Sequence, residues 1–130
     1  DYEGSSVRAA MKALVYYTTV TTYRWAFTLD DAVRWVSLYG ALNLGTDWHR
    51  GMSRPYTGPD GRSWIEPTGT LQGGHAYLLN GVNREQQKFR MENNWGREWG
   101  DNGFAWISFD SVEYLLSQNG EAACPTEVMI

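Results

Sequence analysis

The sequence predicts an α+β fold in which helices come first and a mostly antiparallel β-sheet, able to close into a barrel, follows. Two observations support this prediction. Residues 1–40 contain two stretches with the apolar spacing of amphipathic helices, whereas residues from 73 onward form short β-type runs separated by polar turns. The length of 130 residues suits one core, so we expect a single domain over residues 1–130.

The composition is that of a globular protein, with 42% hydrophobic and 20% charged residues. A net charge of −4 argues against nucleic-acid binding, because phosphate contacts need a basic surface. No apolar run approaches the length of a membrane span, so we expect no membrane segment. Cys124 is the only cysteine, and His49 and His75 are distant in sequence, so we expect neither a disulfide framework nor a metal site.

The first predicted helix begins at Ser5 or Ser6 and places apolar residues at i, i+3, i+4, i+7 and i+8 up to Val15. Residues 18–27 are rich in β-branched and aromatic side chains, which predicts a short strand or extended link.

A second helix is predicted to begin at Thr28, with Asp31 three residues later as its capping-box partner, and to end at Gly40. Its packing residues are expected to be Ala32, Val33, Val36 and Leu38. Residues 41–45 then predict a buried strand. Residues 46–70 contain many prolines and glycines and predict a long irregular loop, which in a compact domain is more often functional than idle.

The second half of the chain predicts strands at 75–82, 87–93 and 103–109, the first two joined by a polar turn at 83–86. Asp110 and Glu113 predict the capping box of a short helix that ends before Gly120. The tail, which ends with residues 128–130, is predicted to add an edge strand.

The residues with the strongest chemical signal are His75 and Asn93. An imidazole can take up a proton near neutral pH, and a side-chain amide can fix its tautomer as a carboxylate does. The 18 residues between them are enough for a strand, a turn and a returning strand, so the two side chains can meet at one end of the sheet. Trp95 and Trp99 follow closely and can shield the hydrogen bond between them from water. The alternative is a core histidine beside a loop whose Asn, Trp and Gly residues only shape a turn.

The motifs G-H-A at residues 74–76 and N-N-W-G-R-E-W-G-D-N-G-F at residues 93–104 resemble the C-terminal half of papain-family (C1) cysteine peptidases. The segment L-G-T-D-W at 44–48 resembles the strand that precedes the active-site loop of that family. The resemblance covers about residues 28–127 and is closest to compact papain-like proteins of actinobacterial phages. It implies a papain-like fold.

Carried over by motif, the resemblance makes His75 the general base and acid and makes Asn93 the residue that orients it. It implies that Trp95 covers their hydrogen bond and that Trp99 supports the loop. It implies no metal and no organic cofactor.

The chain departs from the family at the nucleophile, a cysteine that begins a helix a few residues after an oxyanion-hole glutamine. Ser6, within G-S-S-V, echoes that segment, but no glutamine precedes it and only 69 residues separate it from His75. We therefore expect the N-terminal segment with the cysteine to lie outside this chain, as a missing stretch or a separate chain. Cys124 follows His75 and Asn93 in an order that unrelated cysteine peptidases use, but no helix begins after it to lower its pKa. A buried packing cysteine is the simpler interpretation of Cys124.

The predicted function is therefore that of a papain-like cysteine peptidase fragment, which needs the cysteine-bearing segment as partner and a peptide as substrate. The alternative is a non-catalytic papain-like domain that binds a protein partner or serves assembly, as in a phage structural protein. These interpretations imply a phage virion or the cytoplasm of an infected bacterium as location. A third interpretation is a tryptophan-rich glycan-binding β module.

Three further features have ordinary structural explanations beside functional ones. His49 borders either a substrate cleft or solvent. The aromatic residues of the 46–70 segment form either a ligand-stacking shelf or simple packing; they are Trp48, Tyr56 and Trp64. The charged residues of the predicted hairpin indicate a solvated face; they are Arg84, Glu85, Lys88 and Arg90.

Overall fold

The computed structural model describes residues 20–25 and 28–128, and the side chains of residues 28–123. The strands are β1 (Val20–Trp25), β2 (Leu42–His49), β3 (Tyr56–Thr57), β4 (Ser63–Ile65), β5 (Leu71–Asn83), β6 (Lys88–Glu92), β7 (Phe104–Ser108) and β8 (Glu121–Val128). The helices are α2 (Leu29–Tyr39), α3 (Arg50–Ser53) and α4 (Phe109–Ser117). The helix predicted to begin at Ser5 or Ser6 lies outside the described residues.

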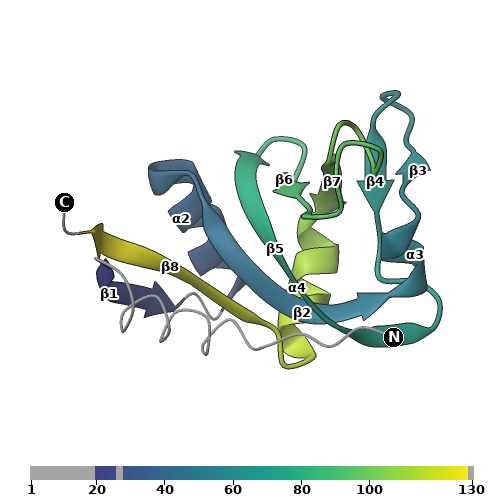
Figure 1. The fold of residues 1–130 in the computed structure, drawn as a ribbon. Coiled ribbons are helices and arrows are strands. Elements are labelled where there is room, and N and C mark those ends of the chain that lie inside the picture. The colour runs from purple at the N-terminus through teal and green to yellow at the C-terminus, as the bar shows by residue number, and fades with distance from the viewer. Residues whose placement is uncertain (1–19, 26–27, 129–130) are drawn as a thin grey trace.

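The strands form one mixed sheet in the order β1-β8-β2-β5-β6-β7-β4-β3. Neighbouring strands are antiparallel throughout, except that β4 runs parallel to β7. The long strands β2 and β5 curve across the molecule, and α4 lies against the sheet (Figure 1). The predicted α+β class with a mostly antiparallel sheet is thus confirmed.

The core lies between one face of this sheet and the helices α2 and α4. Residues of β2 alternate between buried and half-buried, as expected of a strand with one covered face. The fully buried side chains come from strands and helices alike, and the largest include Phe89, Leu44, Leu79, Ile107 and Leu115. This layer fixes β2, β5 and β6, which carry the candidate site.

Helix α2 begins and ends where the sequence predicts. The Thr28 hydroxyl accepts a hydrogen bond from the Asp31 backbone N–H at 3.1 Å, and Gly40 adopts a φ of 99° while its N–H bonds to the Val36 carbonyl. The prediction that Leu38 packs inward is wrong, because this side chain is 70% exposed. Two residues beyond the buried Val36, it projects from nearly the opposite side of the helix.

The segment 46–70, predicted to be a long irregular loop, is largely structured. β2 continues to His49, α3 follows at once, and the short strands β3 and β4 pair with each other before β4 joins β7. Helix α3 packs tightly enough that a Cβ at Gly51 would collide with Thr68. Long-range pairing therefore orders a segment whose glycines and prolines indicated a loop.

The C-terminal elements also differ from the prediction in detail. The N-cap of α4 is Ser108, whose hydroxyl accepts from the Ser111 N–H at 3.1 Å, while Asp110 lies inside the first turn. The tail is not an edge strand, because β8 begins at Glu121 and lies between β1 and β2.

Lys88 does not belong to a solvated face, since it is only 7% exposed. Its ammonium lies 4.1 Å from the centre of the Trp106 ring and 3.5 Å from the Asp60 carboxylate. No described helix is both long enough and apolar enough to cross a membrane.

Candidate active site

The structure brings His75 and Asn93 together at one end of the sheet. His75 lies on β5 directly opposite Thr46 of β2, and Asn93 is the first residue after β6. The two side chains are 3% and 7% exposed. A distance of 2.7 Å separates His75 Nε2 from Asn93 Oδ1, which is a short hydrogen bond.

The loop that follows β6 holds the Asn93 amide in place. The Asn93 backbone N–H donates to the Gly103 carbonyl at 2.9 Å and so closes the base of the loop. The Asn94 backbone N–H donates to Asn93 Oδ1, also at 2.9 Å. A backbone N–H can only donate, so the atom that faces it must be the amide oxygen and not the amide nitrogen.

This orientation determines the tautomer of His75. Because the carbonyl oxygen of Asn93 faces Nε2, and a carbonyl only accepts, the imidazole carries its proton on Nε2. In the neutral ring Nδ1 is then the nitrogen with the lone pair, and it is the atom that can take up a proton. Asn93 thus sets which nitrogen of the neutral ring carries the proton.

Aromatic rings surround the imidazole. The centre of the Trp48 ring lies 4.5 Å away in an edge-on arrangement, the Trp95 ring lies 5.0 Å away, and the Tyr77 ring is stacked at 6.1 Å. Trp95 remains 42% exposed, so it lies between the imidazole and solvent. Trp99 is buried and contacts the rings of both Trp48 and Trp95.

This apolar surrounding lowers the pKa of His75, chiefly because burial penalises the imidazolium, while the hydrogen bond to Asn93 acts in the opposite direction. Burial also raises the pKa of Tyr77. The Tyr77 hydroxyl lies 3.0 Å from Thr46 Oγ1, which itself donates to the Asp47 carbonyl, so Tyr77 is the donor of the pair. Burial thus favours the neutral forms of both the imidazole and the phenol.

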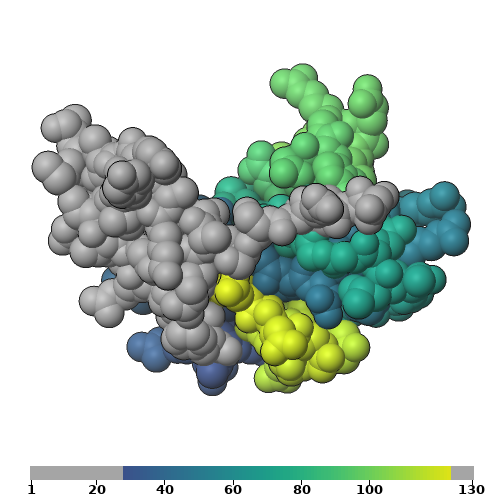
Figure 2. All heavy atoms as spheres, turned by 60° about the horizontal axis from the view of Figure 1, so that its bottom comes forward, coloured from purple at the N-terminus to yellow at the C-terminus, as the bar shows by residue number. Residues whose placement is uncertain are grey.

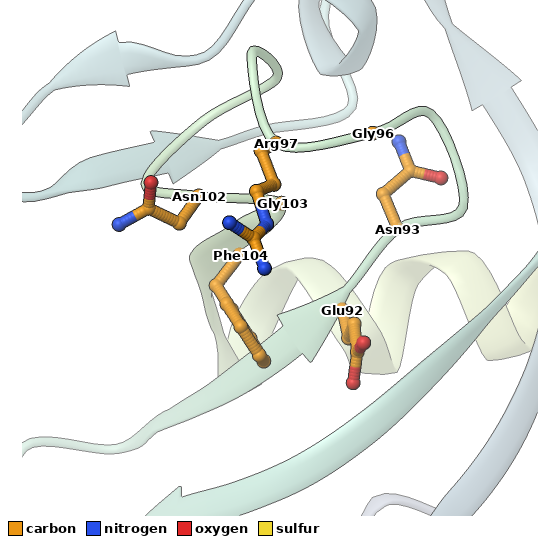
Figure 3. A pocket seen from close by; sticks show the side chains of 7 residues that line it. All are labelled: Glu92, Asn93, Gly96, Arg97, Asn102, Gly103 and Phe104. Carbon is orange, nitrogen blue, oxygen red and sulfur yellow. The ribbon is translucent and has the colours of Figure 1, made fainter.

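A cavity of about 580 Å³ lies next to Asn93, under the loop that joins β6 and β7. Figure 3 shows the Arg97 side chain extending from this loop toward Phe104, with Glu92 and Asn102 on the cavity wall. In the space-filling view the same green loop projects from the surface at the top (Figure 2). The Asn93 amide thus lies between the aromatic surroundings of His75 and this cavity.

The sequence also indicated His49, three aromatic residues of the 46–70 segment and Ser6 as candidates. His49 ends β2, with its Nδ1 3.2 Å from the Gly69 carbonyl. Of the two interpretations of the aromatic residues in this segment, packing holds for Trp48, which is buried beside His75, whereas Tyr56 and Trp64 are paired across β3 and β4. Ser6 lies outside the described residues.

Sequence reasoning missed the contact of Trp48 with His75. The signal was present in the alternation of apolar residues 42, 44 and 48, which extends the predicted strand and directs Trp48 to the same face. The described residues contain no group of three or more His, Cys, Asp or Glu side chains that could hold a metal ion.

No family model matches the sequence, and no curated protein matches it either. Solved structures do match the fold. Xylellain, a cysteine protease from Xylella fastidiosa, is 21% identical with a TM-score of 0.62, and the match covers 85% of this chain and 41% of that one. Digestive procathepsin L2 from Tenebrio molitor is 21% identical with a TM-score of 0.60, over 83% of this chain and 34% of that one.

Bromelain from Ananas comosus in complex with the inhibitor E64 is 16% identical with a TM-score of 0.58, over 82% of this chain and 50% of that one. The chain therefore has a papain-like fold and spans half or less of the length of these structures. At these identities the likeness establishes the fold alone.

Proposed function

We propose that this chain supplies the base and its orienting amide to a cysteine-peptidase site whose thiol comes from a segment outside residues 1–130. The observation that supports the proposal most strongly is the 2.7 Å contact between His75 Nε2 and Asn93 Oδ1, enclosed by aromatic rings. A core histidine needs only a hydrogen-bond partner. Here the partner also fixes the tautomer that turns Nδ1 into a base, and this is what nucleophile activation requires.

The chemistry follows from that tautomer. Nδ1 of His75 takes the proton of the thiol, and the thiolate attacks the carbonyl carbon of a peptide. The imidazolium then donates this proton from Nδ1 to the departing amine as the C–N bond breaks and an acyl-enzyme thioester remains. In the second half Nδ1 removes a proton from water, which attacks the thioester, and the proton returns to the thiol as it leaves. Throughout, Asn93 Oδ1 accepts from Nε2–H and favours the imidazolium.

Cys124 is not positioned to be that thiol. On the strand pairings, Ala123 faces Asn43 of β2, and Asn43 faces Leu78 of β5. Cys124 is therefore about four residues along the sheet from His75 and two strands away. At ~3.3 Å per residue and ~4.8 Å per strand, this corresponds to a backbone separation on the order of 15 Å.

Peptide hydrolysis by the native assembly that contains this chain tests the proposal. His75→Ala is expected to lower the rate by about 100- to 10,000-fold, the usual contribution of a general base. The matched control is Cys124→Ser, which is expected to leave the rate unchanged. An unchanged rate in His75→Ala, or loss of the rate in Cys124→Ser, would refute the assignment.

A second candidate is a non-catalytic papain-like domain that binds a partner or serves assembly, including in a phage particle. It is favoured by the remote position of the only thiol in the chain and by the exposed Trp95 in the loop between β6 and β7. Under this alternative, the native assembly neither hydrolyses peptides nor reacts with E64. The glycan-binding alternative would gain support from loss of the contact between His75 and Asn93, and that contact is present at 2.7 Å.

A further inference from the structure

Ser53, the last residue of α3, forms hydrogen bonds to two of the tryptophans around the candidate site. Its hydroxyl oxygen accepts from Trp48 Nε1 at 2.8 Å, and its backbone carbonyl accepts from Trp99 Nε1 at 3.2 Å. The Ser53 hydroxyl also donates to Gln72 Oε1 at 2.9 Å. One residue outside the motif segments thus connects β2, the start of β5 and the loop after Asn93.

The direction of these hydrogen bonds is fixed by chemistry. An indole N–H can only donate, so Ser53 Oγ must be the acceptor from Trp48 and its own proton must point elsewhere. Gln72 Oε1 receives that proton. The chain from Trp48 through Ser53 to Gln72 is therefore ordered, and the serine hydroxyl has one rotamer that satisfies both partners.

Helix α3 is a firm base for this chain of bonds. The Arg50 and Gly51 backbone N–H groups donate to the carbonyls of Thr70 and Thr68 at 2.9 and 2.8 Å. Met52, next to Ser53, is completely buried. Backbone hydrogen bonds and the buried Met52 thus anchor the short helix that carries Ser53.

Trp48 contacts the His75 ring, and Trp99 belongs to the loop that begins at Asn93. Trp48 is 3% exposed and presents its edge to His75 at 4.5 Å. Trp99 belongs to the loop whose base is closed by the bond from Asn93 N–H to the Gly103 carbonyl. A shift of Trp48 would open the imidazole to water, and a shift of Trp99 would loosen the loop that carries the amide.

We infer that Ser53 is a positioning residue of the candidate site, which holds Trp48 against the His75 ring through its hydroxyl and the Asn93 loop through its carbonyl. The inference rests on the proposed role of His75, but its test needs no peptidase activity. It can therefore fail while the proposed function stands, and the reverse also holds.

Ser53→Ala separates the two contacts, because it removes the hydroxyl and keeps the carbonyl that holds Trp99. Long-range ¹H–¹⁵N NMR of the 130-residue chain reports the tautomer and pKa of each of its two histidines, with His75→Gln to assign the signals. Ser53→Ala is expected to raise the pKa of His75 toward its usual value, because water reaches the ring. The indole N–H of Trp48 is expected to exchange with solvent faster than in the wild type.

The control is Ser37→Ala, which removes a hydroxyl of α2 that donates to the Val33 carbonyl, outside the ring cluster around His75. It is expected to leave the His75 and Trp48 signals unchanged. Ser53→Thr keeps the hydroxyl and is expected to restore wild-type signals. If Ser53→Ala does not fold, Gln72→Ala, at an exposed position, replaces it and is expected to move the same signals in the same direction. A lower melting temperature without any change in the His75 and Trp48 signals would overturn the inference, since Ser53 would then only stabilise the fold.

Discussion

The orienting role of Asn93 can be tested by two substitutions of similar size that are expected to move the pKa of His75 in opposite directions. Asn93→Leu removes the oxygen that accepts from Nε2 and keeps the pocket apolar. Since this hydrogen bond favours the imidazolium, its loss lowers the pKa of His75 further. Asn93→Asp places a carboxylate at the same position, 2.7 Å from Nε2, and raises the pKa of His75, because an adjacent negative charge stabilises the imidazolium.

Asn93→Leu is also expected to lower the stability of the fold. In Asn93→Leu the Nε2–H of a residue only 3% exposed loses its acceptor, and an unsatisfied buried donor costs about 1–3 kcal/mol. The Asn94 N–H loses a partner too, but Asn94 is exposed and water can replace it. For a domain of this size each kcal/mol lowers the melting temperature by about 3–5 °C.

The assay is an NMR titration of the His75 ring nitrogens in the wild type and both variants, with thermal unfolding measured on the same samples. We expect the pKa of His75 to be highest in Asn93→Asp, intermediate in the wild type and lowest in Asn93→Leu. A shift of the pKa in the same direction in both variants, or no shift in either, would refute the orienting role of Asn93.

Three further predictions concern stability. The pKa of His75 in the folded chain lies below its usual value of 6.5, so the unfolded chain binds more protons between these two values. The free energy of unfolding should therefore fall as the pH drops through 6.5. In urea titrations at several pH values, His75→Gln should remove this part of the pH dependence of stability. Asp101 accepts from both the N–H and the hydroxyl of Ser63, at 2.8 and 3.0 Å, so Asp101→Ala should cost about 1–3 kcal/mol and increase amide exchange in the β6–β7 loop; unchanged exchange would argue against this tether. Thr28→Ala removes the N-cap of α2 and should cost about 1 kcal/mol by denaturant unfolding, whereas Thr28→Ser should cost less than half of that.

The candidate pair could be predicted because its geometry depends on local spacing. A strand, a turn of four residues and a returning strand bring residues 75 and 93 to the same end of the sheet, and the alternation of buried residues directs His75 inward. Helix α2 could be predicted for the same reason, because the residues that begin and end it, Thr28 and Gly40, lie directly at its ends.

The strands β4 and β8 and the contact of Trp48 with His75 depend on contacts between residues that are distant in sequence. β4 is only three residues long and is defined by its parallel pairing with β7, and β8 is placed inside the sheet by its register with β1 and β2. The contact of Trp48 with His75 follows from the register of β2 against β5. No pattern in residues 50–70 encodes the pairing of β4 with β7, which is why glycine and proline content alone indicated a loop there.

Covalent labelling of the native assembly by E64, with the modified cysteine located by mass spectrometry, tests directly whether His75 activates a thiol from another segment. We expect an adduct on a cysteine outside residues 1–130, and we expect His75→Ala to slow its formation strongly. An adduct on Cys124, or labelling that is as fast in His75→Ala as in the wild type, would contradict the proposed function.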